Sequence, residues 1–253
     1  MEGKFQNKVA LITGGAMGIG QATALAFARE QAKILVADIM VKGGEDTVRM
    51  IKEAGGDAYF IKTDISQRSD IEEMVRETIG IYDRIDYAFN NVGVGVNLAL
   101  TADFAEENWD HVMNINLKGI WLCMKYEIPI MLKQGGGVIV NMSSASGLHG
   151  TPYQCAYSAS KHGVLGLTKT TALEYAKFGI RVNAVCPGPI LTPGTEGYFN
   201  RDPEAKAKLN ATTPMGRIGL PQEIAETVLW LCSGGASYIT GQSIAIDGGR
   251  SVV

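Results

Sequence analysis

The sequence predicts an α/β fold, a single doubly wound domain with a parallel sheet of about seven strands covered by helices on both faces. Short segments rich in Val and Ile alternate with longer helical patterns along the whole chain. Most of these short segments are continuously apolar, as expected of parallel strands that are buried on both faces. Sustained strand–helix alternation is typical of a doubly wound parallel sheet.

Each expected strand is a short apolar run, and each expected helix is the longer pattern that comes after such a run. The expected strands are Lys8–Thr13, Lys33–Asp38, Ala58–Thr63, Ile85–Asn90, Gly137–Met142, Ile180–Cys186 and Ser243–Ile246. The expected helices are Ile19–Glu30, Gly44–Ala54, Ser69–Ile79, Glu106–Lys133, Tyr153–Phe178 and Gln222–Leu231.

No linker or change of composition divides the chain, so we expect residues 1–253 to form one domain. The segment Gly188–Pro214 departs from the alternation because it is rich in Pro, Gly and Thr and has a charged middle. It is interpreted as a long excursion over the edge of the sheet. Long loops in compact domains often cover sites, which predicts a substrate lid at about residues 190–214.

Composition argues against several classes of protein. The formal charge is −3 and no Lys/Arg-rich run is present, which argues against nucleic-acid binding. No apolar run approaches the ~18 residues that span a bilayer, and the polar N-terminus is not typical of a signal peptide. The four cysteines are scattered and the three histidines show no metal-ligand spacing. We therefore expect a cytoplasmic protein that needs neither a metal nor a membrane.

A glycine cluster comes directly after the first expected strand and opens the first helix. Gly14, Gly18 and Gly20 would permit a tight turn and let the backbone approach a pyrophosphate, which a helix N-terminus stabilises. Such a cluster also occurs for structural reasons alone. Here Asp38 ends the second strand, eighteen residues after Gly20, where a carboxylate accepts hydrogen bonds from adenosine ribose.

The residues around Asp38 favour NAD over NADP. A carboxylate at this place repels a 2′-phosphate. Ala16 and Met17 in the glycine loop, and Ile39 and Met40 after the acid, supply no cation that would bind such a phosphate.

Tyr157, Lys161 and Ser144 form the candidate catalytic group. Tyr157 and Lys161 are four residues apart on an expected helix, so they share a face. A nearby ammonium lowers the pKa of a phenol from its usual ~10, which suits proton exchange with an alcohol or carbonyl. Ser144 ends the fifth strand, at the edge where ligands bind in open α/β sheets. In isolation, these residues would be read as a helix surface pair and a strand end.

Together these motifs resemble the short-chain dehydrogenase/reductase family over essentially the whole chain, which implies a Rossmann-type fold. The resemblance implies a catalytic tetrad of Asn116, Ser144, Tyr157 and Lys161. It suggests that Asn116 interrupts a helix and holds a water that links Lys161 to solvent. The cofactor contacts that the motifs or the resemblance imply are Gly14, Met17, Gly18, Ile19, Gly20, Asp38, Asp64, Ile65, Asn91, Tyr157, Lys161, Ile190 and Thr192.

Candidate substrate contacts lie near the tyrosine in the sequence. Besides Ser144 and Tyr157, they are Ser146, His149 and Gln154. A purely structural loop histidine remains the alternative for His149. Tyr198 and Phe199 in the lid are candidates for apolar cover.

Three functions remain open. The first is an NAD-dependent oxidoreductase of a small secondary alcohol or ketone, such as a cyclic alcohol, diol or sugar. The second is a 3-oxoacyl-[acyl-carrier-protein] reductase, which would need basic residues near the site, whereas Gly135 and Phe178 occupy the places where such reductases carry arginines. The third is a non-catalytic NAD-binding relative. The family resemblance further implies a homo-oligomer, most often a tetramer.

Overall fold

The computed structural model describes residues 3–252 and contains one parallel sheet of seven strands in the order β3-β2-β1-β4-β5-β6-β7. The crossover between β1 and β4 creates the switch point at which open α/β sheets bind ligands. In chain order the strands are β1 Val9–Thr13, β2 Lys33–Asp38, β3 Asp57–Lys62, β4 Tyr87–Asn90, β5 Gly137–Met142, β6 Ile180–Pro187 and β7 Ser243–Ile246.

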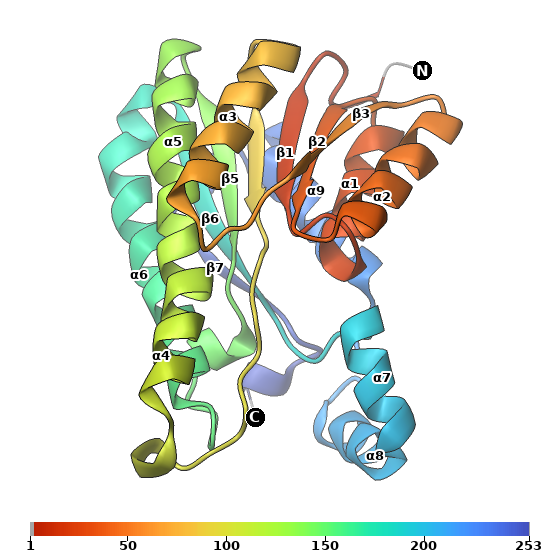
Figure 1. Cartoon of the computed structure of the whole chain (residues 1–253), viewed down its shortest axis with the longest axis vertical. Coiled ribbons are helices and arrows are strands. Elements are labelled where there is room, and N and C mark those ends of the chain that lie inside the picture. The colour runs from red at the N-terminus through yellow and green to blue at the C-terminus, as the bar shows by residue number, and fades with distance from the viewer. Residues whose placement is uncertain (1–2, 253) are drawn as a thin grey trace.

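Helices cover both faces of the sheet (Figure 1). One layer contains α1 Gly18–Arg29, α2 Val41–Glu53 and α9 Pro221–Cys232. The other contains α3 Arg68–Tyr82, α4 Glu106–Met113, α5 Ile120–Lys133 and α6 Cys155–Tyr175. Each layer buries its own apolar cluster against the sheet, with Phe27 and Ile34 in the first and Met74 and Ile139 in the second. The predicted doubly wound fold is confirmed.

Two expectations about the elements need correction. The long helix expected over Glu106–Lys133 is divided by a π-helical segment, Asn114–Gly119, between α4 and α5. The excursion at Gly188–Pro214 is not a loop, because it folds into α7 Pro193–Arg201 and α8 Pro203–Thr212. Both helices lie beyond the carboxyl ends of the strands, where Figure 1 shows them below the sheet.

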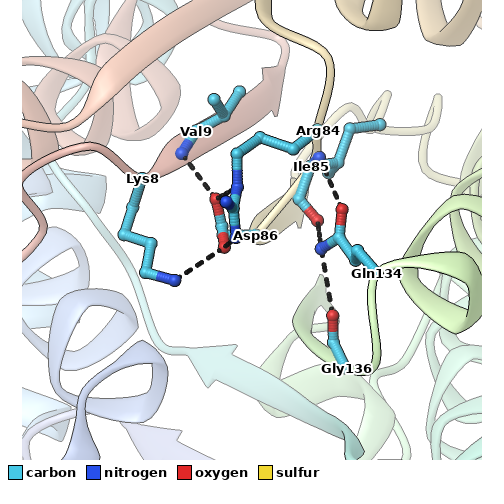
Figure 2. Close-up of polar contacts among 7 residues, drawn as sticks. All are labelled: Lys8, Val9, Arg84, Ile85, Asp86, Gln134 and Gly136. Atoms are coloured by element: carbon cyan, nitrogen blue, oxygen red, sulfur yellow. Dashed lines mark hydrogen bonds and ion pairs between the residues drawn. The ribbon is translucent and has the colours of Figure 1, made fainter.

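A buried carboxylate joins the amino ends of β1 and β4 (Figure 2). These are the ends of the strands away from α7 and α8 (Figure 1). Asp86 is 6% exposed and accepts hydrogen bonds from the Val9 backbone N–H at 3.0 Å, from Arg84 at 2.6 and 2.7 Å, and from Lys8 at 3.1 Å. Beside it, the Gln134 side chain donates to the carbonyls of Ile85 and Gly136 and accepts from the Ile85 N–H. These contacts fix the starts of the central strands, so their carboxyl ends are held in register.

Candidate active site

A cleft of about 1170 Å³ opens along the carboxyl ends of the strands, lined by the glycine loop, the ends of β2, β4, β5 and β6, the start of α6, and α7 and α8. This volume exceeds the ~300–1,000 Å³ of ordinary small-molecule pockets. The cleft therefore has room for a ligand larger than a typical metabolite.

The glycine loop turns sharply into α1 at one end of the cleft. Gly14 has φ +67° and Gly18 has φ +57°, a backbone region that favours glycine. A Cβ on Gly14 would stand 2.7 Å from the side-chain nitrogen of Asn91. The Asn91 amide donates to the carbonyls of Thr13 and Gly14 at 3.0 and 3.1 Å. Asn91 therefore positions the loop whose helix N-terminus faces the cleft.

Asp38 is rigidly held beside this loop. One carboxylate oxygen accepts from the Ala16 N–H at 3.0 Å and the other from the Met40 N–H at 2.9 Å. Asp38 is only 9% exposed and lines the cleft. Among the described lining residues there is no arginine, and Lys161 is the one lysine.

The remaining cofactor-site candidates also line the cleft. On the Asp38 side these include Asp64, Ile65 and Asn91, and on the other side Ile190 and Thr192. Ile190 forms a parallel bridge with Gly219, and the Thr192 hydroxyl lies 3.2 Å from that of Thr195. The concave glycine turn, the helix N-terminus and the fixed carboxylate together fit a dinucleotide.

Ser144, Tyr157 and Lys161 meet in the same cleft. Ser144 comes after the end of β5, and its hydroxyl is hydrogen-bonded to the phenol of Tyr157. The Lys161 ammonium donates to the Met142 carbonyl at 3.0 Å and lies 5.6 Å from the centre of the Tyr157 ring. The structure thus brings Ser144, Tyr157 and Lys161 together, as their spacing in the sequence predicted.

The charges in this cluster differ from the sequence-based expectation. Burial raises the pKa of Tyr157 above its usual value, and the Ser144 hydrogen bond offsets only part of this rise. Burial also lowers the pKa of Lys161 to about 8. Lys161 was expected to lower the pKa of Tyr157, but its ammonium lies over the ring and bonds to a carbonyl, so burial dominates. At neutral pH the structure holds a neutral phenol beside a mostly charged lysine.

Asn116 lies in the π-helical segment and is fully buried. Its side-chain oxygen accepts from the Val94 N–H at 2.8 Å, and its amide donates to the Val94 carbonyl at 3.0 Å. A Cβ on Gly93 would lie 3.1 Å from the Lys161 nitrogen and 3.5 Å from the Asn116 oxygen. The expected interruption of the helix is confirmed. The visible role of Asn116 is to hold the segment after β4 against Lys161, and the water remains a prediction.

The expected substrate contacts divide into two groups. Ser144, Gln154, Tyr157 and Phe199 line the cleft. Ser146 and His149 are not among the lining residues, since the Ser146 hydroxyl accepts from Thr151 and His149 is exposed with its ring facing the Gly150 carbonyl. The side chain of Tyr198 lies outside the described part of the structure.

Sequence reasoning missed several apolar residues that line the substrate end of the cleft. Val94 and Val96 come from the segment after β4, and Leu209 comes from α8. No local motif marks them, because only the fold brings these segments into the cleft that Tyr157 also lines. For Leu209, the apolar positions of the Pro193–Thr212 region were the one signal in the sequence that could have indicated a side chain packed over the cleft.

The chain belongs to the short-chain dehydrogenase/reductase family. Residues 14–251 match the family profile described as Enoyl-(Acyl carrier protein) reductase. The oxidoreductases of this family use nicotinamide cofactors, which agrees with the cleft described above.

Similar proteins include oxidoreductases with different substrates in their names. A 3-oxoacyl-[acyl-carrier-protein] reductase of Thermotoga maritima is 45% identical, covering 97% of this chain and 98% of that protein. A cyclohexanol dehydrogenase of Acinetobacter sp. is 39% identical, covering 98% and 96%. The crystal structure of a levodione reductase has a TM-score of 0.95 at 37% identity, covering 98% of this chain and 99% of that one.

None of the described helices is long and apolar enough to cross a membrane.

Proposed function

We propose that the protein is an NAD-dependent oxidoreductase that transfers a hydride between nicotinamide and a small secondary alcohol or ketone. The observation that carries this proposal is the meeting of Ser144, Tyr157 and Lys161 in the cleft that also contains Asp38. A bound nicotinamide would supply or accept the hydride. A non-catalytic relative has no need for a half-buried phenol hydrogen-bonded to a serine beside a buried lysine.

The chain's own residues would then manage orientation and the proton. Ser144 donates a hydrogen bond to the substrate oxygen and holds it beside the Tyr157 phenol. In reduction, Tyr157 gives its proton to that oxygen, and in oxidation it accepts the proton back. Lys161 supplies the positive charge that stabilises the phenolate as it forms. The raised pKa of Tyr157 favours the proton-donating form at neutral pH.

The preference for NAD rests on Asp38. Its carboxylate is fixed by two backbone N–H groups but keeps lone pairs for ribose hydroxyls. A 2′-phosphate in the same place would meet a buried negative charge with no arginine among the described lining residues.

For the substrate we propose a cyclic alcohol, diol or sugar rather than a chain on a carrier. The substrate end of the cleft combines apolar Val94, Val96 and Phe199 with the polar Gln154. Such a lining suits a compact apolar ring that carries one further oxygen. Relatives named for cyclohexanol, levodione and a cyclohexadiene diol support this substrate class.

A carrier-protein thioester is the second candidate because one of the similar reductases bears that name. The sequence argument against it is weakened by the fold. Gly135 and Phe178 precede β5 and β6, so they lie at the amino edge of the sheet, opposite the cleft. The net charge of −3 still offers no long-range attraction to an acidic carrier.

The test is a substrate panel monitored through NADH absorbance. Cyclic and acyclic secondary alcohols are oxidised with NAD or NADP, and ketones and an acetoacetyl-carrier thioester are reduced with NADH or NADPH. We expect the highest kcat/KM for a cyclic substrate with NAD(H). A kcat/KM for the thioester far above every free ketone, falling steeply with added salt, would establish the second candidate instead.

We also propose a cytoplasmic homotetramer. Support for the assembly comes from an apolar groove of about 1200 Å³ across α4, the π-helical segment, α5 and α6, which includes Leu117, Trp121 and Leu167. Support for the compartment comes from four cysteines that are all free thiols, of which Cys123, Cys186 and Cys232 are buried.

A further inference from the structure

A chain of hydrogen bonds between buried polar side chains links α5, β4, β5 and α6. Glu127 on α5 is fully buried and accepts a hydrogen bond from the Asn90 side-chain amide on β4 at 3.1 Å. The same Asn90 amide donates to the Asn141 carbonyl oxygen on β5 at 3.2 Å. The Asn141 amide donates to the Thr168 hydroxyl on α6 at 3.0 Å. These hydrogen bonds join α5 and α6 to the central strands β4 and β5.

Two oxygens in this chain are buried without a hydrogen-bond partner among the described residues: Oε1 of Glu127 and Oδ1 of Asn90. The Glu127 carboxyl and the Asn90 amide are already joined by the hydrogen bond from the Asn90 nitrogen to Oε2 of Glu127. Oε1 and Oδ1 are the remaining oxygens of these two groups. As two bare acceptors, a carboxylate oxygen and an amide oxygen repel each other, and each buried unpaired group destabilises the folded state. A single proton between them satisfies both.

We propose that Glu127 is a protonated positioning residue, whose Oε1 hydroxyl donates to Oδ1 of Asn90 and closes a cyclic acid–amide pair. In this pair Asn90 donates one hydrogen bond to Glu127 and accepts another from it. The proton stays on Glu127 and is not transferred, so no bond to carbon or nitrogen changes.

The surroundings of Glu127 agree with a neutral side chain. Its hydrogen-bond partner is Asn90, which in turn bonds to Asn141, and Asn141 bonds to Thr168; none of these side chains carries a charge. On its own helix the Cys123 thiol is close, and burial raises the pKa of that thiol well above its usual value. No cation forms a salt bridge with Glu127 in the described part of the chain. Burial raises the pKa of Glu127 to about 7, and the Asn90 hydrogen bond opposes only part of the rise.

The pair matters for the active site because Asn90 is covalently joined to Asn91. The Asn91 side chain holds the carbonyls of Thr13 and Gly14 in the glycine loop. A fixed Asn90 side chain therefore fixes the end of β4 from which Asn91 reaches the loop. Loss of the pair would weaken cofactor binding, although Glu127 itself is not one of the residues that line the cleft.

The test compares the wild type with Glu127→Gln and Glu127→Leu. A glutamine keeps both hydrogen bonds of the pair without a titrating proton, whereas a leucine removes both. The ¹³C shift of the Glu127 carboxyl, assigned by its loss in Glu127→Gln, reports its protonation directly. We expect it to titrate near pH 7, and a titration near 4.5, the value of a free carboxyl, would overturn the proposal.

Unfolding at fixed protein concentration gives an independent measure. When folding raises the pKa of a carboxyl, that group stabilises the folded protein at low pH. This contribution is lost as the pH rises from the unfolded to the folded pKa. From pH 4.5 to 7, the unfolding constant of the wild type should rise about 80-fold relative to Glu127→Gln, since each pKa unit is tenfold and the carboxyl is half-titrated at both ends of this range. A ratio that stays flat over this range would refute the protonated pair. Glu127→Leu should weaken NADH binding at every pH while Glu127→Gln restores it, and equal weakening by both variants would also refute it.

Discussion

At the scale of single residues, function depends on side chains whose atoms are committed to fixed partners. Asp38 is an example, because two backbone N–H groups hold its carboxylate at the end of β2. A fixed charge discriminates between ligands better than a mobile one, since it cannot turn away from an unwanted phosphate.

We predict that Asp38→Ala relaxes the preference for NAD. A like charge at ~4 Å is worth up to ~4 kcal/mol at an effective dielectric of ~20, and a charge-assisted hydrogen bond to ribose adds ~1.5–3 kcal/mol. After solvent screening, ~3 kcal/mol corresponds to a roughly hundredfold preference. The measurement is kcat/KM with NAD and NADP for the wild type and the variant. Glu45→Ala is the matched control, because Glu45 is exposed on α2 and does not line the cleft. An unchanged preference in Asp38→Ala would show that another group selects the cofactor.

At the scale of elements, the π-helical segment is what brings Asn116 to Val94. The wider turn aims a buried amide at the backbone after β4, where both Val94 polar groups bond to it. π-bulges inside α-helices frequently occur at functional sites. Here the distortion links α5 to the segment that passes Lys161.

We predict that Asn116→Ala lowers both stability and turnover. It leaves the N–H and carbonyl of Val94 without their partner, which costs ~1–3 kcal/mol. Urea unfolding and steady-state kinetics measure the two effects. If turnover falls and stability does not change, Asn116 acts through a bound water rather than through Val94. Asn114→Ala is the control, because Asn114 begins the same segment but bonds to the Ser66 carbonyl.

The strands and the Tyr157–Lys161 pair were predictable because each has a local signal, whereas Asn116 was expected from the family resemblance alone. Continuous Val/Ile runs mark buried parallel strands, and the Tyr157–Lys161 spacing places both side chains on one helix face. The helices α7 and α8 were missed because Pro and Gly suggested a loop. Yet Pro193 and Pro203 begin these helices, and Asp202 caps the second by accepting from the Ala205 N–H. Proline at a first helical position after a capping residue was the signal to recognise.

The substrate contacts were less predictable because loop direction depends on long-range packing. Ser146 and His149 are close to Ser144 in sequence, but a 3-10 turn capped by Ser144 directs them away from the cleft lining. The pair of Glu127 and Asn90 could not be predicted either, since it joins residues 37 positions apart on different elements.

At the scale of the whole molecule, the two ends of the strands have different roles. The carboxyl ends form the candidate active site, and the amino ends carry contacts that stabilise the fold. The cleft lies at the carboxyl edge, whereas Asp86 at the amino edge ties β1 and β4 together (Figure 2). Burial alone would raise the pKa of Asp86, but Arg84, the Val9 N–H and Lys8 together hold it below its usual value.

We predict that Asp86→Asn destabilises the protein by about 2 kcal/mol at pH 7, within the range of ~1.5–3 kcal/mol for hydrogen bonds to charged groups. Because folding lowers this pKa, the stabilisation is present above the unfolded value of 3.8 and is lost as pH falls below it. The difference in free energy of unfolding between wild type and variant should therefore shrink between pH 5 and pH 3, taken as about one unit either side of that value. A difference that grows on acidification would contradict this assignment.

We predict that Gly166→Arg breaks the proposed tetramer. Gly166 is exposed on α6 in the apolar groove, and a Cβ there meets no atom within 4 Å among the described residues. The substitution is therefore compatible with one folded chain but places a charge in the proposed interface. Gly80→Arg is the control, because Gly80 is also exposed, on α3, with equally open space. Light scattering should give a smaller molar mass for Gly166→Arg than for the wild type and Gly80→Arg. Equal molar masses for all three proteins would exclude the groove as the interface.

The central claim is that Tyr157 moves the proton while other residues hold most of the cofactor, and Tyr157→Phe tests it most directly. The measurement is single-turnover oxidation of the best alcohol from the panel, together with the dissociation constant of NADH measured by fluorescence. The ring and its packing remain, but the proton-transferring oxygen is removed, so we predict a rate loss of ~10²–10⁴. The dissociation constant of NADH should change little, because Asp38 and the glycine loop still line the cleft. A variant that keeps more than about a tenth of the wild-type rate would contradict the account, because its loss would be smaller than the lower bound for a positioned acid/base group.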